Sequence, residues 1–98
     1  MKVQWLSAAL DEYEAATHYL IANAGVTSAR QFAAQVKDCV RRLREFPMIG
    51  TPVAGRRARR FALHGHPYFL IYRVHVDHLS IVALAHQRRR PGYWAKRR

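Results

Sequence analysis

The chain has 98 residues and a formal net charge of +11, and half of its residues are hydrophobic. That length predicts one compact domain, residues 1–98, with a modest core. The charge is uneven, because residues 1–55 carry six Lys or Arg against five Asp or Glu, whereas residues 56–98 carry eleven against Asp77 alone. Such asymmetry indicates an acidic or polyanionic partner for the second half. A basic surface kept for solubility is the competing explanation, but it accounts poorly for runs of arginine.

The residues at the N-terminus and the lone cysteine bear on location. Cys39 has no second cysteine to pair with, so an internal disulfide is excluded and a reducing cytoplasm is expected. Acidic residues from Asp11 onward interrupt any secretory apolar segment, and no apolar run is long enough to cross a bilayer. We therefore expect a cytoplasmic protein with no membrane partner.

The N-terminal half predicts a strand followed by a helix. Residues 2–5 have the pattern of a short strand, and Ser7 is expected to cap a helix that runs to about Ala24. Gly25 is a natural stop for that helix. Apolar residues spaced by three and four predict one buried face, made of Ala9, Tyr13, Ala16, Leu20 and Ala24.

A second helix is predicted directly afterwards. Ser28 to Gln31 has the form of a capping box that opens it, and Pro47 ends it. Its expected buried stripe consists of Ala29, Phe32, Val36, Cys39, Val40 and Leu43. The short connection between the two helices implies an antiparallel hairpin over residues 7–46. Residues 47–55 contain two prolines and two glycines and predict a loop.

The second half predicts a sheet and then a tail. Strand-like runs near 57–64, 68–75 and 79–86 with short connections favour an antiparallel meander over residues 57–86. The predicted fold class is α+β, with an antiparallel sheet (the short N-terminal strand plus the meander) packed against the helical hairpin. Residues 87–98 are basic and lack periodicity, so a tail with a disordered end is expected.

The clearest functional candidate follows the last predicted strand. Three consecutive arginines, Arg88 to Arg90, precede two aromatic residues, Tyr93 and Trp94. Guanidinium groups bind phosphates or carboxylates, and aromatic rings stack on bases or insert into a partner's pocket. The segment predicts a binding or catalytic edge; a solvated tail with Trp94 folded back over apolar surface is the alternative.

A second candidate is the arginine-rich first strand of the meander. Alternation puts Arg59, Phe61 and Leu63 on one face. Since Phe61 and Leu63 suit the core, Arg60 and His64 are expected to point outward. Two interpretations remain open: a phosphate-binding face, or an edge strand whose charge prevents aggregation.

Other chemistries find little support. The six histidines match no standard zinc spacing, so neither a metal nor a cofactor is expected. The sequence has no Gly-rich phosphate loop, no nucleophile elbow and no paired carboxylates in its basic half. His86 could act as a general acid or base, or it could simply bond backbone at the end of a strand. Cys39, on a buried stripe, is poorly placed for a nucleophile. Macromolecular binding remains, or RNA cleavage by Arg, Tyr and His.

Several segments together resemble the RelE/ParE superfamily of toxins from bacterial type II toxin–antitoxin pairs. The resemblance covers nearly the full length and rests on the order and spacing of residues 43–47, 49–52, 60–61, 68–74, 81–86 and 88–94. It implies an antiparallel sheet with a helical hairpin against it, in agreement with the elements predicted above.

The superfamily divides on function. RelE-like members cleave messenger RNA on the ribosome with basic residues on central strands and a basic–tyrosine pair near the C-terminus, whereas ParE-like members poison DNA gyrase. Arg60 matches an expected strand cation, but Ala62 and Phe69 stand where further cations are expected. Neither can stabilise a transition-state phosphate. Arg88 and Tyr93 could fill the C-terminal roles.

The resemblance therefore favours a ParE-like, plasmid-stabilisation type of toxin that is not an enzyme and that binds gyrase. The target-binding residues it implies are Arg60, Arg73, His86, Arg88, Arg89, Arg90, Tyr93 and Trp94. A ribosome-dependent endoribonuclease is the alternative, with catalytic candidates Arg60, His64 or His86, Arg88 and Tyr93. A non-toxic nucleic-acid-binding module is the third possibility. The resemblance also implies a cognate antitoxin with an acidic, partly disordered segment, bound in a toxin–antitoxin hetero-oligomer.

Overall fold

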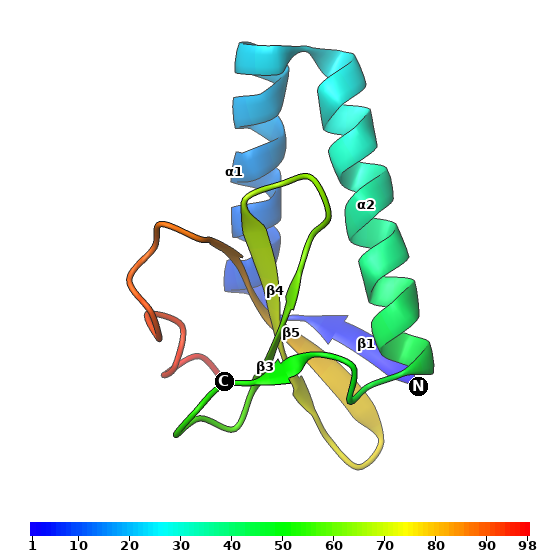
Figure 1. Ribbon diagram of the computed structural model, residues 1–98, viewed down its shortest axis with the longest axis vertical. Coiled ribbons are helices and arrows are strands. Elements are labelled where there is room, and N and C mark those ends of the chain that lie inside the picture. Colours follow the sequence, from blue (N-terminus) through cyan, green and yellow to red (C-terminus); the bar gives the residue numbers. More distant parts are fainter.

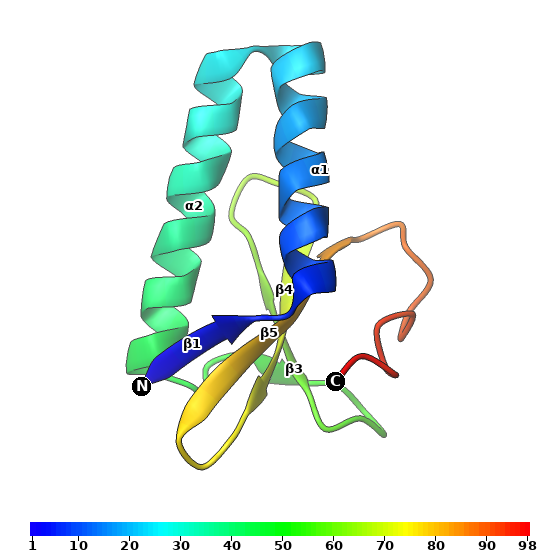
Figure 2. The same ribbon diagram turned by 180° about the vertical axis from the view of Figure 1, so that it is seen from behind.

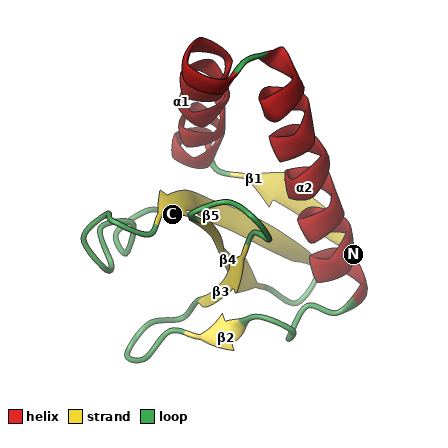
Figure 3. Ribbon diagram, turned by 45° about the horizontal axis from the view of Figure 1, so that its top comes forward, coloured by secondary structure: helices red, strands yellow, loops and turns green.

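The computed structural model describes residues 1–98 as two helices that cover one face of a five-stranded sheet (Figures 1 and 3). In chain order the elements are β1 (Lys2–Trp5), α1 (Ser7–Ala24), α2 (Val26–Glu45), β2 (Thr51–Pro52), β3 (Arg59–Ala62), β4 (Tyr68–Val74) and β5 (His78–His86). The predicted α+β class and helical hairpin are confirmed. Neither helix is both long and apolar enough to span a membrane.

The sheet is mixed, with strand order β1-β5-β4-β3-β2. Strands β2 to β5 pair antiparallel, whereas β1 pairs parallel with β5, so the prediction of a wholly antiparallel sheet is wrong for β1. A parallel neighbour needs a long crossover connection, and the helical hairpin and strands β2 to β4 lie between these two strands in the chain. The expected loop at residues 47–55 also contains β2. Its Pro52 is tolerated because β2 is an edge strand.

A single residue connects the two helices. Gly25 has a φ of 92°, and its N–H donates to the last turn of α1. Its carbonyl accepts the N–H of Ala29 at 3.2 Å, so α2 begins at Val26. The predicted capping box at Ser28 is therefore wrong, because Ser28 already lies inside the helix and its hydroxyl donates to the carbonyl of Ala24.

The start of α1 also differs from its prediction. Ser7 is the first helical residue and not the cap, and the capping position is Leu6, which has no side-chain hydrogen bond. The carbonyl of Leu6 accepts the N–H groups of Ala9 and Leu10, and its own N–H donates to Ile81 of β5. Backbone hydrogen bonds of Leu6, the residue after β1, thus set the helix start, and a serine cap is not needed.

The first core lies between the helices and the sheet. Its buried members are Ala9, Ala16, Phe32, Val36, Cys39, Leu43, Leu63, Leu70, Tyr72, Leu79, Ile81 and Leu84. The stripe predicted for α2 is confirmed, including the buried Cys39. The face predicted for α1 is confirmed except at its end, where Ala24 is exposed. Phe32 is fully buried and its ring contacts those of Tyr13 and Tyr68.

A second, smaller core forms on the other face of the sheet. It contains Ala58, Ile71, Val82, Ala83, Ala85 and Trp94. Ile71 pairs with Ala83 and Tyr72 pairs with Ile81, so Val82 is an extra residue in β5. Such a bulge bends a strand and re-aims its side chains, and here both Val82 and Ala83 belong to the second core.

Residues 87–98, called the C-terminal segment below, are not a disordered tail. After β5 the segment loops outward and returns to the sheet through a series of turns (Figure 2). Backbone hydrogen bonds order it, from Gln87 to Pro67 and from Arg97 to Trp94. The prediction failed because the segment is ordered by contacts with distant residues and not by a periodic pattern of its own.

Candidate functional site

Trp94 anchors the C-terminal segment. Only 3% of its surface is exposed, and it packs into the second core. The flanking Tyr93 and Ala95 are partly buried against the same core. The ring of Trp94 is therefore not at the surface, although the sequence made it a candidate for contact with a target. It holds in position the arginines that precede it.

Glu12 of α1 ties the C-terminal segment to the sheet and the helices. Its Oε2 accepts the hydroxyl of Tyr93 at 2.5 Å, and the guanidinium of Arg97 donates to both of its oxygens, at 2.7 and 3.1 Å. The carboxylate and the guanidinium are mostly shielded, with 17% and 23% of their side-chain surfaces exposed. An Arg–carboxylate pair of this bidentate form fixes geometry as well as adding energy.

Glu12 and Arg97 also hydrogen-bond an open edge of β5. Strand β1 pairs with β5 only as far as Ile81, so the outer backbone groups farther along β5 lack a strand partner. The N–H of Leu84 donates to Oε1 of Glu12 at 3.1 Å, and the carbonyl of Val82 accepts from Arg97 at 3.1 Å. Because unpaired backbone groups are costly when buried, Glu12 and Arg97 satisfy β5 where β1 stops.

Tyr93 is held as a neutral hydrogen-bond donor. Burial raises the pKa of its hydroxyl, and the hydrogen bond to Glu12 acts in the same direction. The guanidinium groups of Arg89 and Arg97 lie 3.9 and 5.1 Å from the centre of its ring, within cation–π range. A phenol in this setting can position neighbouring groups, but it is poorly suited to accept a proton at neutral pH.

Several predicted residues meet at a small hollow beside the end of β5, called the β5 hollow below. Its volume is about 120 Å³, and the predicted residues that line it are Arg60, His86, Arg89, Arg90, Tyr93 and Trp94. Arg60 comes from β3, and its guanidinium lies 5.0 Å from the ring centre of Phe69. His86 ends β5, and its Nδ1 accepts the N–H of Arg88 at 3.1 Å. The fold thus brings the strand arginine and the C-terminal arginines to one place.

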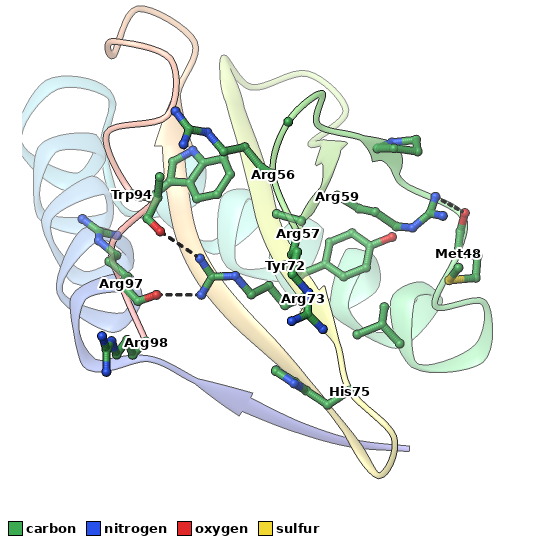
Figure 4. Close-up of a pocket in the computed structure, with 15 residues that line it drawn as sticks. Met48, Arg56, Arg57, Arg59, Tyr72, Arg73, His75, Trp94, Arg97 and Arg98 are labelled. Atoms are coloured by element: carbon green, nitrogen blue, oxygen red, sulfur yellow. Dashed lines mark hydrogen bonds between the residues drawn. The ribbon is translucent and has the colours of Figure 1, made fainter.

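Three other predicted residues, Arg88, His64 and Arg73, do not line this hollow. Arg88 is exposed and does not line it, and His64 is exposed at the end of β3. Arg73 instead holds the C-terminal segment, because its guanidinium donates to the carbonyls of Arg97 at 2.7 Å and Ala95 at 3.3 Å (Figure 4). The structure has no group of three or more His, Cys, Asp or Glu side chains that could hold a metal ion.

Sequence reasoning missed Glu12, Arg97 and a larger groove to which Arg97 contributes. Both residues are charged and lie in segments with no motif, so nothing in the sequence distinguishes them from solvated surface. The groove, called the arginine groove below, has a volume of about 740 Å³. The arginines that line it are Arg56, Arg57, Arg59, Arg73, Arg97 and Arg98.

The sequence matches a known protein family over most of its length. A family model described as the ParE toxin of type II toxin–antitoxin systems, parDE, matches residues 3–91. The chain belongs to the ParE toxin family. The predicted resemblance to the RelE/ParE superfamily is thereby confirmed. The match ends before Trp94 and Arg97, the two residues that fix the C-terminal segment of this ParE-family chain.

The fold agrees with that assignment. A solved structure titled as the chromosomal ParDE TA system from P. aeruginosa superposes with a TM-score of 0.79 and 18% sequence identity. The superposition covers 88% of this chain and 95% of that chain. No curated protein sequence matches the chain significantly. Membership of the ParE family implies an antitoxin partner.

Proposed function

We propose that this ParE-family toxin inhibits growth by binding DNA gyrase through Arg88, Arg89 and Arg90 and the adjoining β5 hollow. The observation that carries the proposal is that Arg88, Arg89 and Arg90 are all exposed while the segment that bears them is fixed at both ends. Tyr93 and Trp94 hold it after the arginines, and β5 holds it before them. Preorganised guanidinium groups lose less conformational entropy on binding than groups on a mobile tail.

Arg60 and His86 extend the same surface. Arg60 is exposed and lines the hollow with Arg89 and Arg90, whereas Trp94 and Arg73 act on the surface indirectly by holding the segment. Arginine is enriched among the side chains that dominate binding at protein interfaces. A cytoplasmic location is part of this proposal, since gyrase acts on DNA there.

The antitoxin partner is expected to carry an acidic segment. The second half of the chain has a net charge of +10, which is electrostatically complementary to an acidic segment. Exposed apolar side chains on the helical hairpin offer a separate contact surface, namely Leu10, Tyr19, Ile21 and Val26. A disordered segment that folds on binding could cover both surfaces in a hetero-oligomer.

The direct test is gyrase supercoiling of relaxed plasmid with increasing amounts of purified toxin. Wild-type toxin should inhibit supercoiling and trap cleaved DNA. A variant with Arg88, Arg89 and Arg90 all changed to alanine should lose at least about tenfold in potency, as expected when several exposed interface arginines are removed together. Lys2, Arg30 and Lys37 are also exposed and lie outside the hollow, so their triple alanine variant is a control matched in charge. Full inhibition by the first variant would refute the proposal.

Messenger RNA cleavage on the ribosome is the second candidate, and the shared hollow of Arg60, His86 and Tyr93 is the observation that favours it. Against it, Tyr93 is bonded to Glu12 and its raised pKa opposes a role as base. Ala62 and Phe69 also supply no cations on the strands. Mapping transcript 5′ ends after induction separates the candidates, because codon-phased breaks indicate the nuclease. A non-toxic nucleic-acid-binding module would leave growth unaffected.

A further inference from the structure

The arginine groove adjoins the β5 hollow, since Trp94 lines both, but none of its arginines lines the hollow. It runs between the loop after β2, the end of β4 and the last residues of the chain (Figure 4). Six arginines line it and no Asp or Glu does. Arg97 is paired with Glu12, but no carboxylate pairs with the other five arginines. Such a cluster attracts anions and is costly in free energy unless an anion or solvent screens it.

Three of the six arginines are already engaged by the protein. Arg59 donates to the carbonyls of Met48 and Gly50, at 3.1 and 2.7 Å. Arg73 holds carbonyls of the C-terminal segment, and Arg97 is paired with Glu12. These guanidinium groups form the walls of the groove. Arg59 and Arg73 bond only carbonyls, so their charges are unbalanced there, whereas the charge of Arg97 is balanced by Glu12.

The other three arginines are free. Arg56, Arg57 and Arg98 are exposed, and none of them makes a side-chain hydrogen bond or an ion pair with the protein. Each guanidinium can offer a forked set of N–H donors to a phosphate. Arg56 also lies close to the backbone of Gly92, because a Cβ added to that glycine would meet Arg56 Nη2 at 3.1 Å.

We propose that the arginine groove binds the phosphate backbone of duplex DNA through Arg56, Arg57 and Arg98. Contacts from arginine to phosphate oxygens are independent of base sequence and supply most of the affinity of non-specific DNA binding. The groove gives no means to read base edges, since no element of it projects as a helix or a ribbon. Binding is therefore expected to be insensitive to sequence.

The floor of the groove favours a duplex over a single strand. Its phenol and indole rings, Tyr72 and Trp94, are 0% and 3% exposed, and the ring of its exposed His75 is already stacked on His78, with 4.2 Å between the ring centres. Binding of single strands relies on bases that stack on several accessible rings, and here Tyr72 and Trp94 are covered while His75 stacks on His78. The groove is also a poor site for an acidic peptide that binds by adding a strand to the sheet. The adjacent β2 has only two residues, and Pro52 has no N–H to pair with an added strand.

DNA binding by the groove goes beyond gyrase inhibition and is measured with toxin and DNA alone. The probe is a fluorescein-labelled duplex of random sequence, followed by anisotropy over a series of salt concentrations. The test variant changes Arg56, Arg57 and Arg98 to alanine, and the triple alanine variant of Lys2, Arg30 and Lys37 is the control. A second test variant changes the same three groove arginines to lysine, which keeps the charge.

The groove variant should bind at least about tenfold more weakly at moderate salt, and its salt slope should fall by about 2 to 3, as three phosphate contacts are lost. The control should change affinity by less than about threefold, and the lysine variant should keep the wild-type slope. An equal change in duplex affinity in the groove variant and in the control would overturn the proposal. So would tighter binding of a single strand of the same length, or of a polyglutamate peptide of equal charge. Thermal unfolding monitored by circular dichroism verifies that each variant is folded.

The outcome is distinguishable from that of the gyrase proposal. If the groove variant loses DNA binding but still inhibits supercoiling, the two surfaces act separately. If the variant of Arg88 to Arg90 loses inhibition while it still binds duplex DNA, the gyrase surface and the groove are both supported. Loss of DNA binding in the variant of Arg88 to Arg90 alone would move the DNA site to the β5 hollow and refute the groove.

Discussion

The two faces of the sheet are covered in different ways. On one face two helices bury a core of twelve side chains. On the other face the C-terminal segment covers a core of six, and Trp94 is the only large ring buried there. The first cover depends on apolar packing along whole helices. The second depends on one indole and on the polar contacts of Glu12, Tyr93 and Arg97.

This difference separates stability from the proposed function within one small domain. The helix-covered face provides most of the buried apolar surface, which is the main favourable contribution to folding. The C-terminal segment provides little of it, but it carries exposed arginines and forms a wall of the arginine groove. A segment held by few contacts can open locally while the rest stays folded. If the helices and the C-terminal segment are independent in this way, each can be disrupted without unfolding the other.

The largest effect is expected at the helix-covered face. Phe32→Ala removes a fully buried ring, and it should lower the free energy of unfolding by about 3 to 5 kcal/mol. Denaturant titration followed by circular dichroism measures the change, and the loss should be global, with helices and sheet unfolding together. A loss below about 1 kcal/mol would mean that this core is not as tightly packed as its burial indicates.

The corresponding change on the other face is Trp94→Ala. It should cost about 3 kcal/mol, the low end for removal of a buried aromatic ring, because a released segment can relax into solvent. Amide hydrogen exchange should accelerate in residues 87–98 and at Leu84, while α2 keeps its protection. Acceleration spread evenly over the whole chain would show that the two covers form a single cooperative unit.

A smaller effect is expected when the polar junction, meaning the contacts of Glu12 with Tyr93 and Arg97, is weakened. Glu12→Gln removes the charge that pairs with Arg97 and should cost about 1 to 2 kcal/mol, since the pair is shielded but not fully buried. Glu14→Gln, on the exposed surface of the same helix, is the matched control and should change the thermal midpoint little. If both variants melt alike, the junction adds nothing to stability.

The smallest effect concerns alkaline pH. The pKa of Tyr93 is raised above its ordinary value of 10.0, so the folded state favours the protonated hydroxyl. Its contribution is complete below pH 10 and is lost as pH rises through the raised pKa. Between about pH 9 and 11, Tyr93→Phe should therefore lose less stability than the wild type. Stability of the variant should still fall with pH to some extent, because burial also raises the pKa values of Tyr13, Tyr68 and Tyr72. If the free energy of unfolding fell equally with pH in both proteins, the pKa of Tyr93 would not be raised by folding.

Local pattern in the sequence was sufficient for most of the fold. The apolar stripe of α2 and the alternation of Phe61 in β3 with Leu63 directly after it are local signals, and both were predicted correctly. The start of α2 was missed because Gly25 ends one helix and begins the next, which leaves no room for the capping box at Ser28. The parallel pairing of β1 was missed because strand order depends on contacts between distant residues.

The candidate site was predictable only in part. The run of arginines was visible as an uninterrupted charge signal, and the fold brings Arg89 and Arg90 beside Arg60. The burial of Trp94 and the roles of Glu12 and Arg97 were not predictable, because Glu12 and Tyr93 are separated by about 80 residues and meet only in the folded chain. A partly shielded carboxylate looks the same in sequence as a solvated one.

The most direct test of this account is gyrase inhibition by Trp94→Ala alongside the wild type. The substitution leaves every exposed arginine in place and removes only the anchor of the segment that carries them. Wild-type toxin should inhibit supercoiling of relaxed plasmid, and the variant should inhibit at least about tenfold less well, as binding then bears the ordering cost of the segment, while circular dichroism shows its helices intact. Equal inhibition by the two proteins would contradict the account, because it would mean that the arginines act from a mobile tail.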